Sequence, residues 1–126
     1  MSDKDFSIRM LSVVIDCKNA NTLADFYASL LGWQKNTDDP EWISVSKSGI
    51  TPCLLFQEEV DYKPPVWPDN PNEQQKSIHL DFAVSDIKKA IQHAIDCGAT
   101  AASVQFSDYW TVMIDPEGHP FCLCQR

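Results

Sequence analysis

One succession of sequence patterns occurs twice in this chain of 126 residues, and it constrains the fold more than any other feature. Each copy has a strand-like segment, a residue that can cap a helix, an amphipathic stretch and a glycine. Asn19 follows Ser12 by seven residues, and Asp86 follows His79 by seven. Because the copies agree in order and spacing rather than in identity, we interpret them as a duplicated structural unit.

Both amphipathic stretches have the periodicity of a helix with one apolar face. Their apolar residues recur at i, i+3, i+4, i+7 and i+8: Leu23, Phe26, Tyr27, Leu30 and Leu31 in the first copy, and Ile87, Ala90, Ile91, Ala94 and Ile95 in the second. Asn19 can cap the first helix, and Ser85 or Asp86 the second. The expected helices begin at residues 20 and 87 and end at Gly32 and Gly98.

Short β-branched and aromatic segments surround the two expected helices. The expected strands cover residues 9–17, 33–36, 42–46, 52–57, 77–84, 99–106, 109–114 and 120–125. The sequence therefore predicts an α+β fold of two tandem βαβββ modules. We expect the helices to cover one face of a curved mixed sheet, and the other face to form a concave pocket.

We expect a single domain at residues 9–126, preceded by a flexible arm at residues 1–8. Module one covers residues 9–57 and module two covers residues 77–126. The intervening residues 58–76 contain four prolines and no clear periodicity, which predicts a stiffened loop. This loop carries Tyr62 and Trp67, and it could be either a binding lid or a plain linker.

The composition excludes several classes of partner. A net charge of −8 disfavours nucleic acid and anionic membranes. No apolar run is long enough for a transmembrane span or a signal peptide, so we expect a cytoplasmic protein. The five cysteines are an odd number, and reduced thiols are the expectation in that compartment.

Three segments resemble the glyoxalase-like proteins of the vicinal oxygen chelate superfamily. Ser12–Gly32 (SVVIDCKNANTLADFYASLLG) is similar to the opening of their first module and His79–Gly98 (HLDFAVSDIKKAIQHAIDCG) to the opening of their second. Asp115–Cys122 (DPEGHPFC) is similar to their closing turn. The resemblance covers residues 9–126 and implies a homodimer. Relatives include glyoxalase I, extradiol dioxygenases, epimerases, fosfomycin-inactivating transferases and metal-free bleomycin-binding proteins, so the fold alone does not choose an activity.

The resemblance also assigns four positions that hold a divalent metal in some members. They fall on Ser12, Gln57, His79 and Cys122. A serine hydroxyl and a neutral amide are poor ligands, so we expect no metal cofactor; if one binds, Gln57, His79 and Cys122 are its candidates. Cys124 shares a strand face with Cys122, which suggests a zinc site with His79, but two residues on one strand lie too far apart without help from other strands.

His79 and Asp81 are the candidate catalytic residues, because they share a strand face and could act as an acid–base pair. Cys122 could be a nucleophile beside His79, or an inert buried thiol. The leading hypothesis is a small-molecule-binding protein whose pocket is lined by Ser12, Gln57, Trp67, His79 and Cys122. The alternative is a lyase, isomerase or dioxygenase, metal-dependent or using acid–base chemistry. Whether the chain is an enzyme stays open at this point.

Overall fold

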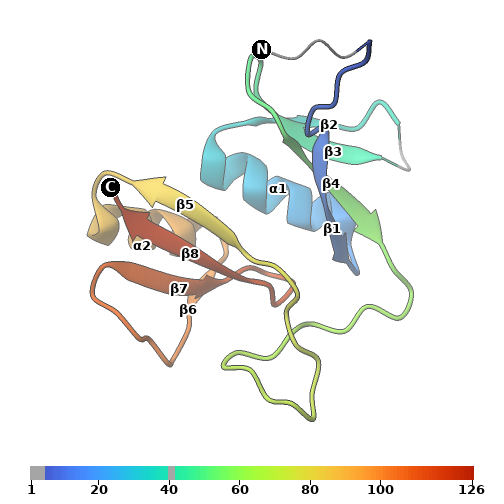
Figure 1. Cartoon of the computed structure of the whole chain (residues 1–126). Coiled ribbons are helices and arrows are strands. Elements are labelled where there is room, and N and C mark those ends of the chain that lie inside the picture. The colour runs from blue at the N-terminus through green and yellow to red at the C-terminus, as the bar shows by residue number, and fades with distance from the viewer. Residues whose placement is uncertain (1–4, 40–41) are drawn as a thin grey trace.

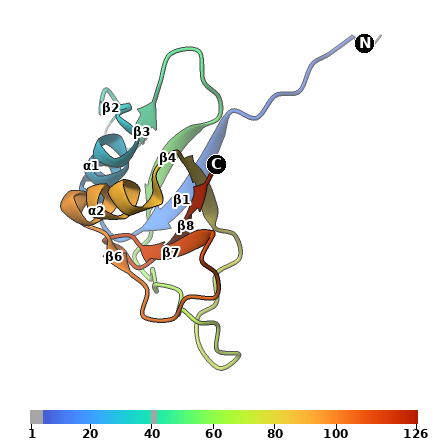
Figure 2. The same ribbon diagram turned by 90° about the vertical axis from the view of Figure 1, so that its left-hand side faces the viewer.

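A computed structural model describes residues 5–39 and 42–126. Its elements follow the order β1 (Ser12–Cys17), α1 (Ala20–Leu31), β2 (Gln34–Asn36), β3 (Ile43–Ser46), β4 (Cys53–Glu58), β5 (Leu80–Val84), α2 (Ile87–Cys97), β6 (Thr100–Ala101), β7 (Trp110–Ile114) and β8 (Pro120–Gln125). The first four residues of the expected arm lie outside the described part. The described residues 5–11 have no regular structure and extend away from the body (Figure 2).

The strands form two four-stranded sheets with the same topology, which confirms two βαβββ modules. The first sheet has the order β1-β4-β3-β2 and the second the order β5-β8-β7-β6 (Figure 1). In each sheet the first and last strands of the module pair in parallel, and the remaining pairs are antiparallel. The two modules therefore share the order of their elements and also the way in which their strands pair.

The two helices begin and end at the residues that the sequence indicated. The Asn19 side chain accepts a hydrogen bond from the Thr22 backbone N–H at 3.1 Å, and Gly32 ends α1 with a φ of 68°. Asp86 rather than Ser85 caps α2, accepting from the Lys89 N–H at 3.2 Å. The helices lie side by side at the left of Figure 2, and strands of both sheets, among them β1, β4, β7 and β8, lie to their right.

An aromatic cluster at the centre of the core joins the modules. The Tyr27 ring lies 5.8 Å from that of Phe56 in β4, 6.5 Å from that of Phe82 in β5 and 6.2 Å from that of Phe121 in β8, measured between centroids. Tyr27 is 1% exposed. Residues of both sheets therefore share one continuous apolar interior.

Three expected strands are shorter by three residues or more than the sequence suggested. Residues 9–11 remain outside β1 and residues 77–79 outside β5, and the segment expected at 99–106 pairs only over Thr100–Ala101. The side chain of Gln105 explains the last difference, because its amide donates to the Val112 carbonyl and accepts from the Val112 N–H, both at 2.8 Å. A side chain thus takes the place of a backbone partner, and residues 102–109 form an irregular loop instead.

Candidate functional site

The face of the second sheet that points away from the helices carries a cavity of about 470 Å³. Side chains alternate along a strand, and the register places Cys122 between Asp81 of β5 and Val112 of β7. By the same register Cys124 lies beside Trp110 on this face. The lining residues are Trp67, Lys76, His79, Asp81, Phe106, Trp110, Val112, Pro120, Cys122, Cys124 and Arg126.

Aromatic rings form the walls of this cavity. The indole N–H of Trp67 donates to the Val104 carbonyl at 3.1 Å, which fixes the loop over the second sheet. The Phe106 ring packs edge-on against it, with 5.8 Å between centroids. Trp110 is 42% exposed, so its ring is available to a bound molecule. Rings with few polar groups between them are the usual lining of small-molecule sites.

One cation lies on this wall. The Lys76 ammonium is 4.9 Å from the centre of the Trp67 ring and 2.9 Å from a carboxylate oxygen of Asp69. Its position covers part of the ring face that a planar cation would need.

The polar floor of the cavity consists of His79, Asp81 and Cys122. His79 Nε2 lies 3.2 Å from Asp81 Oδ1, and the donor atoms of all three residues lie within 4.8 Å of one another. Burial, followed by the charge of Asp81, raises the pKa of Cys122 to about 11. Cys122 is therefore a protonated thiol at neutral pH, which is a poor nucleophile.

The structure does not bring the other two predicted site residues to this cavity. Ser12 and Gln57 line neither of the cavities described, and the Gln57 amide donates to Glu59 at 2.8 Å. Gln57 pairs with Asp16, four residues along β1 from Ser12. At about 3.3 Å per residue, roughly 13 Å separates the two positions. A single ion cannot contact both, so the four-position metal set that the resemblance implies does not fit these residues.

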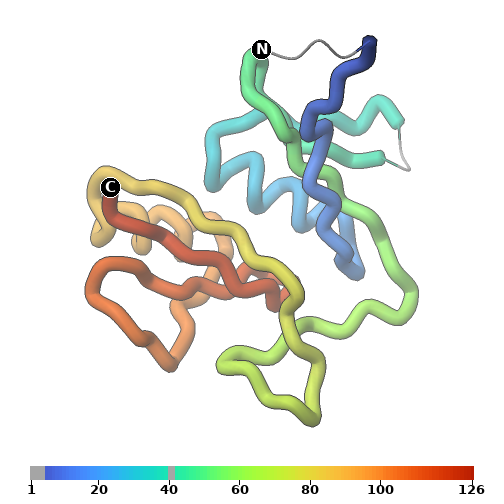
Figure 3. The backbone as a smooth tube through the Cα atoms, in the orientation of Figure 1, coloured from blue at the N-terminus to red at the C-terminus, as the bar shows by residue number. Residues whose placement is uncertain are grey.

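A second cavity of about 460 Å³ lies between the modules and shares Lys76, His79 and Pro120 with the first. The loop from residue 59 to residue 79 crosses from module one to module two (Figure 3), and several of its residues line this cavity. Its lining is more charged and includes Asp16, Glu59 and Asp61. The loop lines both cavities, so it does more than connect the modules.

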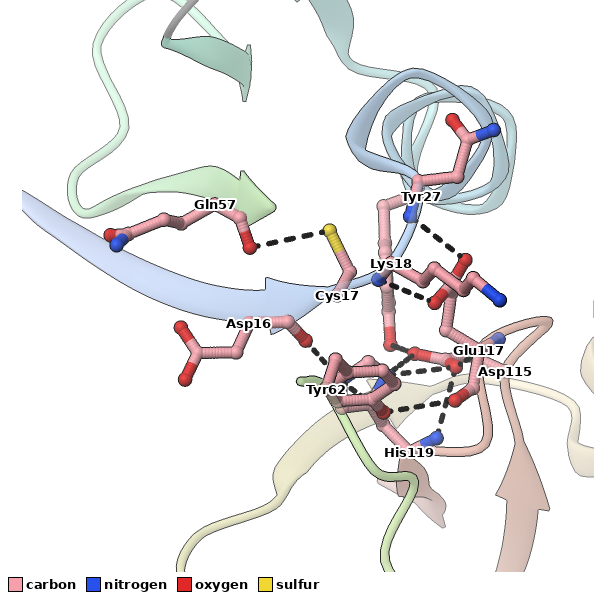
Figure 4. A network of polar contacts seen from close by, with 10 residues as sticks. Asp16, Cys17, Lys18, Tyr27, Gln57, Tyr62, Asp115, Glu117 and His119 are labelled. Atoms are coloured by element: carbon pink, nitrogen blue, oxygen red, sulfur yellow. Dashed lines mark hydrogen bonds and ion pairs between the residues drawn. The ribbon is translucent and has the colours of Figure 1, made fainter. Parts of the chain in front are cut away.

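A polar network around His119 ties module two to module one, and the sequence did not point to its extent (Figure 4). His119 Nδ1 lies 2.8 Å from the buried Asp115 carboxylate, which also accepts from the Tyr27 hydroxyl at 2.7 Å. His119 Nε2 lies 2.7 Å from the Asp16 carbonyl. Tyr62 of the loop donates to the Glu117 carbonyl at 2.9 Å. Strand β1, helix α1, the loop and the closing turn thus meet at one imidazole.

The hydrogen-bond partners of His119 favour the imidazolium form. Nδ1 faces the Asp115 carboxylate and Nε2 faces the Asp16 carbonyl, and both groups only accept hydrogen bonds. The Tyr62 hydroxyl also lies 3.0 Å from Nε2, and it accepts there because it donates its own proton to the Glu117 carbonyl. Burial alone would lower the pKa of His119, but the hydrogen bond and charge of Asp115 outweigh it, and the pKa is raised. The same closing turn reaches the start of α1, where the Glu117 carboxylate accepts from the backbone N–H of Lys18 at 2.8 Å and of Asn19 at 3.2 Å.

The sequence also missed the role of His93. Its ring nitrogen lies 3.0 Å from the Leu30 carbonyl, in the last turn of α1, and so joins the two helices. Only the register between the helices could have revealed this contact.

Among the described residues, no helix is long and apolar enough to cross a membrane.

A family model of the glyoxalase-like domain matches residues 12–124. The chain belongs to the glyoxalase-like domain family. No curated protein shows significant sequence similarity to it. Solved structures share its fold at low identity.

Three of these structures show the range of proteins on this fold. A glyoxalase/bleomycin resistance protein/dioxygenase family enzyme from Burkholderia phytofirmans PsJN is 18% identical, with 90% of this chain and 95% of that chain covered and a TM-score of 0.67. TnmS3, an antibiotic binding protein from Streptomyces sp. CB03234, is 16% identical, with coverages of 97% and 98% and a TM-score of 0.64. The trypanothione-dependent glyoxalase I of Leishmania major is 18% identical, with coverages of 94% and 87% and a TM-score of 0.65.

Proposed function

We propose that this glyoxalase-like protein binds a planar, mainly apolar small molecule in the cavity over its second sheet. The observation that carries the proposal is the set of aromatic rings, Trp67, Phe106 and Trp110, around a floor of His79, Asp81 and Cys122. A drug-sized molecule fits a volume of about 470 Å³. The likeness in fold to an antibiotic binding protein supports a binding role for this architecture.

The charges around the cavity favour a neutral or anionic ligand over a cation. Lys76 and Arg126 line it against one carboxylate, that of Asp81, although the whole chain has a net charge of −8. Lys76 also lies over the Trp67 ring. A cationic ligand would meet this ammonium, whereas an anionic group would gain a partner from it.

A second candidate function is an acid–base enzyme such as a lyase or isomerase. The contact of 3.2 Å between His79 and Asp81 at the floor favours it, because the carboxylate can orient the imidazole as a general base. This reading predicts that His79→Gln abolishes turnover of a bound molecule while its affinity changes little. Simple binding predicts no turnover in either protein.

Two planar dyes test the proposed ligand class. The anion 8-anilinonaphthalene-1-sulfonate should bind the protein with saturating fluorescence, and the cation ethidium should bind more weakly. Trp67→Ala should weaken binding of the anionic dye at least about tenfold, because the loss of a central aromatic anchor costs more than about 1.4 kcal/mol. Trp42→Ala is the matched control, since Trp42 is 48% exposed in module one. Equal losses in both variants, or tighter binding of ethidium, would contradict the proposal.

A homodimer and a cytoplasmic location, which the sequence and the family resemblance imply, stay predictions. Sedimentation velocity of the purified chain would check the first, and fractionation of the source cell the second.

A further inference from the structure

We propose that His79, Asp81 and Cys122 form a binding site for a borderline-soft divalent cation such as Zn²⁺, contained entirely within module two. The site differs from the four-position set implied by the family resemblance, because Asp81 takes part and Ser12 and Gln57 do not. It goes beyond the proposed ligand binding, which does not depend on it.

The backbone explains how three donors meet. Asp81 and Cys122 are direct neighbours in the register of the parallel strands β5 and β8. His79 precedes Asp81 by two residues and lies against it, with 3.2 Å between Nε2 and Oδ1. Residues i and i+2 of one strand are roughly 6.6 Å apart at the backbone and cannot enclose an ion by themselves. The neighbouring strand supplies the missing donor here.

The distances suit a tetrahedral ion after small side-chain rotations. Zinc lies about 2.0–2.3 Å from nitrogen, oxygen and sulfur ligands, which places neighbouring donor atoms roughly 3.3–3.6 Å apart. The nitrogen–oxygen pair is already at 3.2 Å, and all the donor atoms lie within 4.8 Å of one another. Two of the residues are free to adjust, since the His79 and Asp81 side chains are 39% and 62% exposed.

The donor chemistry selects the metal. One imidazole nitrogen, one carboxylate oxygen and one thiolate sulfur suit zinc and cobalt, whereas calcium and magnesium require oxygen ligands. Binding replaces the proton of the Cys122 thiol with the metal and releases that proton to solvent. The thiolate and the Asp81 carboxylate then balance the two positive charges of the ion.

The nearby cation does not exclude the site. Lys76 Nζ is held at 3.0 and 2.9 Å by the two carboxylate oxygens of Asp69, and so it is not paired with the Asp81 carboxylate that the metal would need. Three protein donors leave the fourth position of a tetrahedral ion open, as in zinc sites that accept a ligand or a water. That position would be reached from the aromatic-walled cavity, since all three residues line it.

Titration of the metal-free chain with Co²⁺ tests the site, because a thiolate bound to cobalt gives a charge-transfer absorption band. The band should saturate at one Co²⁺ per chain and disappear when Zn²⁺ displaces the cobalt. Cys122→Ser should abolish it, and the matched control Cys124→Ser should retain it. Asp81→Asn, at an exposed position, should weaken cobalt binding at least about tenfold. Loss of a residue that only orients a metal ligand already costs about that much, and Asp81 is proposed to be a ligand itself.

No band in the wild type would overturn the metal site, and so would a band that survives in Cys122→Ser or is lost in Cys124→Ser. Circular dichroism of each variant confirms that it is folded before its titration is interpreted. Binding of the anionic dye is measured on metal-free protein. Failure of the metal site and failure of the proposed ligand binding are therefore separate results.

Discussion

The two modules share a topology but differ in the sheet face that points away from the helices. In the first sheet the β1–β4 pair presents Asp16 and Gln57 as direct neighbours on that face, with Ser12 four residues away, and no histidine lies among them. In the second sheet the β5–β8 pair presents Asp81 and Cys122 side by side. Aromatic rings surround this second pair.

This difference indicates which parts of a duplicated fold are free to vary. The helix-facing sides of both sheets contribute to one core around Tyr27, so both must stay apolar. The opposite faces are not needed for that core. One module can therefore carry the polar side chains and aromatic rings of a site, while the other contributes mainly to the shared core.

Tyr27→Ala should have the largest effect, a loss of about 3–5 kcal/mol in the free energy of unfolding, because it removes a buried ring that contacts both sheets. Tyr27→Phe should cost only about 1 kcal/mol, since Asp115 keeps its other hydrogen bonds. Chemical denaturation followed by circular dichroism measures both. If the modules are one unit, Tyr27→Ala still unfolds in one transition. Separate transitions for the two modules would break the account of a shared core.

Gly118→Ala should destabilise the protein by about 2–4 kcal/mol, because backbone strain and a steric clash add. Gly118 has a φ of +94°, and an added Cβ would lie 2.6 Å from Cβ of Pro64 in the loop. Gly49 is the matched control in module one, with a φ of +81° but open space around its Cα. Gly49→Ala should cost only the backbone strain, about 1–2 kcal/mol. Thermal unfolding of both variants measures the difference, and equal losses would show that the loop does not pack against the closing turn.

The junction around His119 should make stability fall as the pH rises. The folded state raises the pKa of His119, so its contribution is fully present below the unfolded value of about 6.5 and is lost as the pH rises through the folded pKa. Within that window the free energy of unfolding should fall by at most about 1.4 kcal/mol per pH unit.

His119→Gln is the variant that isolates this contribution. It should be less stable than the wild type below pH about 6.5, and the gap should narrow as the pH rises. Urea denaturation at a series of pH values measures it. A gap that does not change with pH would mean that His119 is neutral in the folded protein.

Ser12→Ala and Gln57→Ala should have the smallest effect. Both side chains lie on the first sheet and line neither cavity, so stability should change by less than about 0.5 kcal/mol. The affinity for the anionic dye should change less than about twofold. A loss of dye affinity comparable to that of Trp67→Ala would indicate that the dye binds at the interface between the two sheets instead.

Local patterns predicted much of this structure from the sequence. The expected helix at 20–31 and the strand at 120–125 have the observed bounds, because periodicity, caps and glycines are properties of neighbouring residues. Strand alternation also placed His79 beside Asp81. The expected strand at 99–106 was wrong over most of its length, since a side-chain amide of Gln105 replaced backbone pairing.

Contacts between distant residues could not be predicted in this way. The hydrogen bond from His119 to the Asp16 carbonyl joins residues 103 positions apart, and no motif marks either partner for the other. Trp67 was expected to line the pocket, but the loop that carries it has no periodicity from which its contact with the Val104 carbonyl could be derived. The grouping of Asp81 with Cys122 depends on the register of β5 and β8, which the sequence left open.

The indole N–H signals of the four tryptophans provide the most direct test of the site on module two. Trp33 and Trp42 report on module one, and Trp67 and Trp110 line the cavity. In a two-dimensional ¹H–¹⁵N NMR spectrum of labelled protein, 8-anilinonaphthalene-1-sulfonate should shift the signals of Trp67 and Trp110 and leave those of Trp33 and Trp42 in place. Shifts confined to Trp33 and Trp42 would contradict the account, because the ligand would then lie on the wrong module.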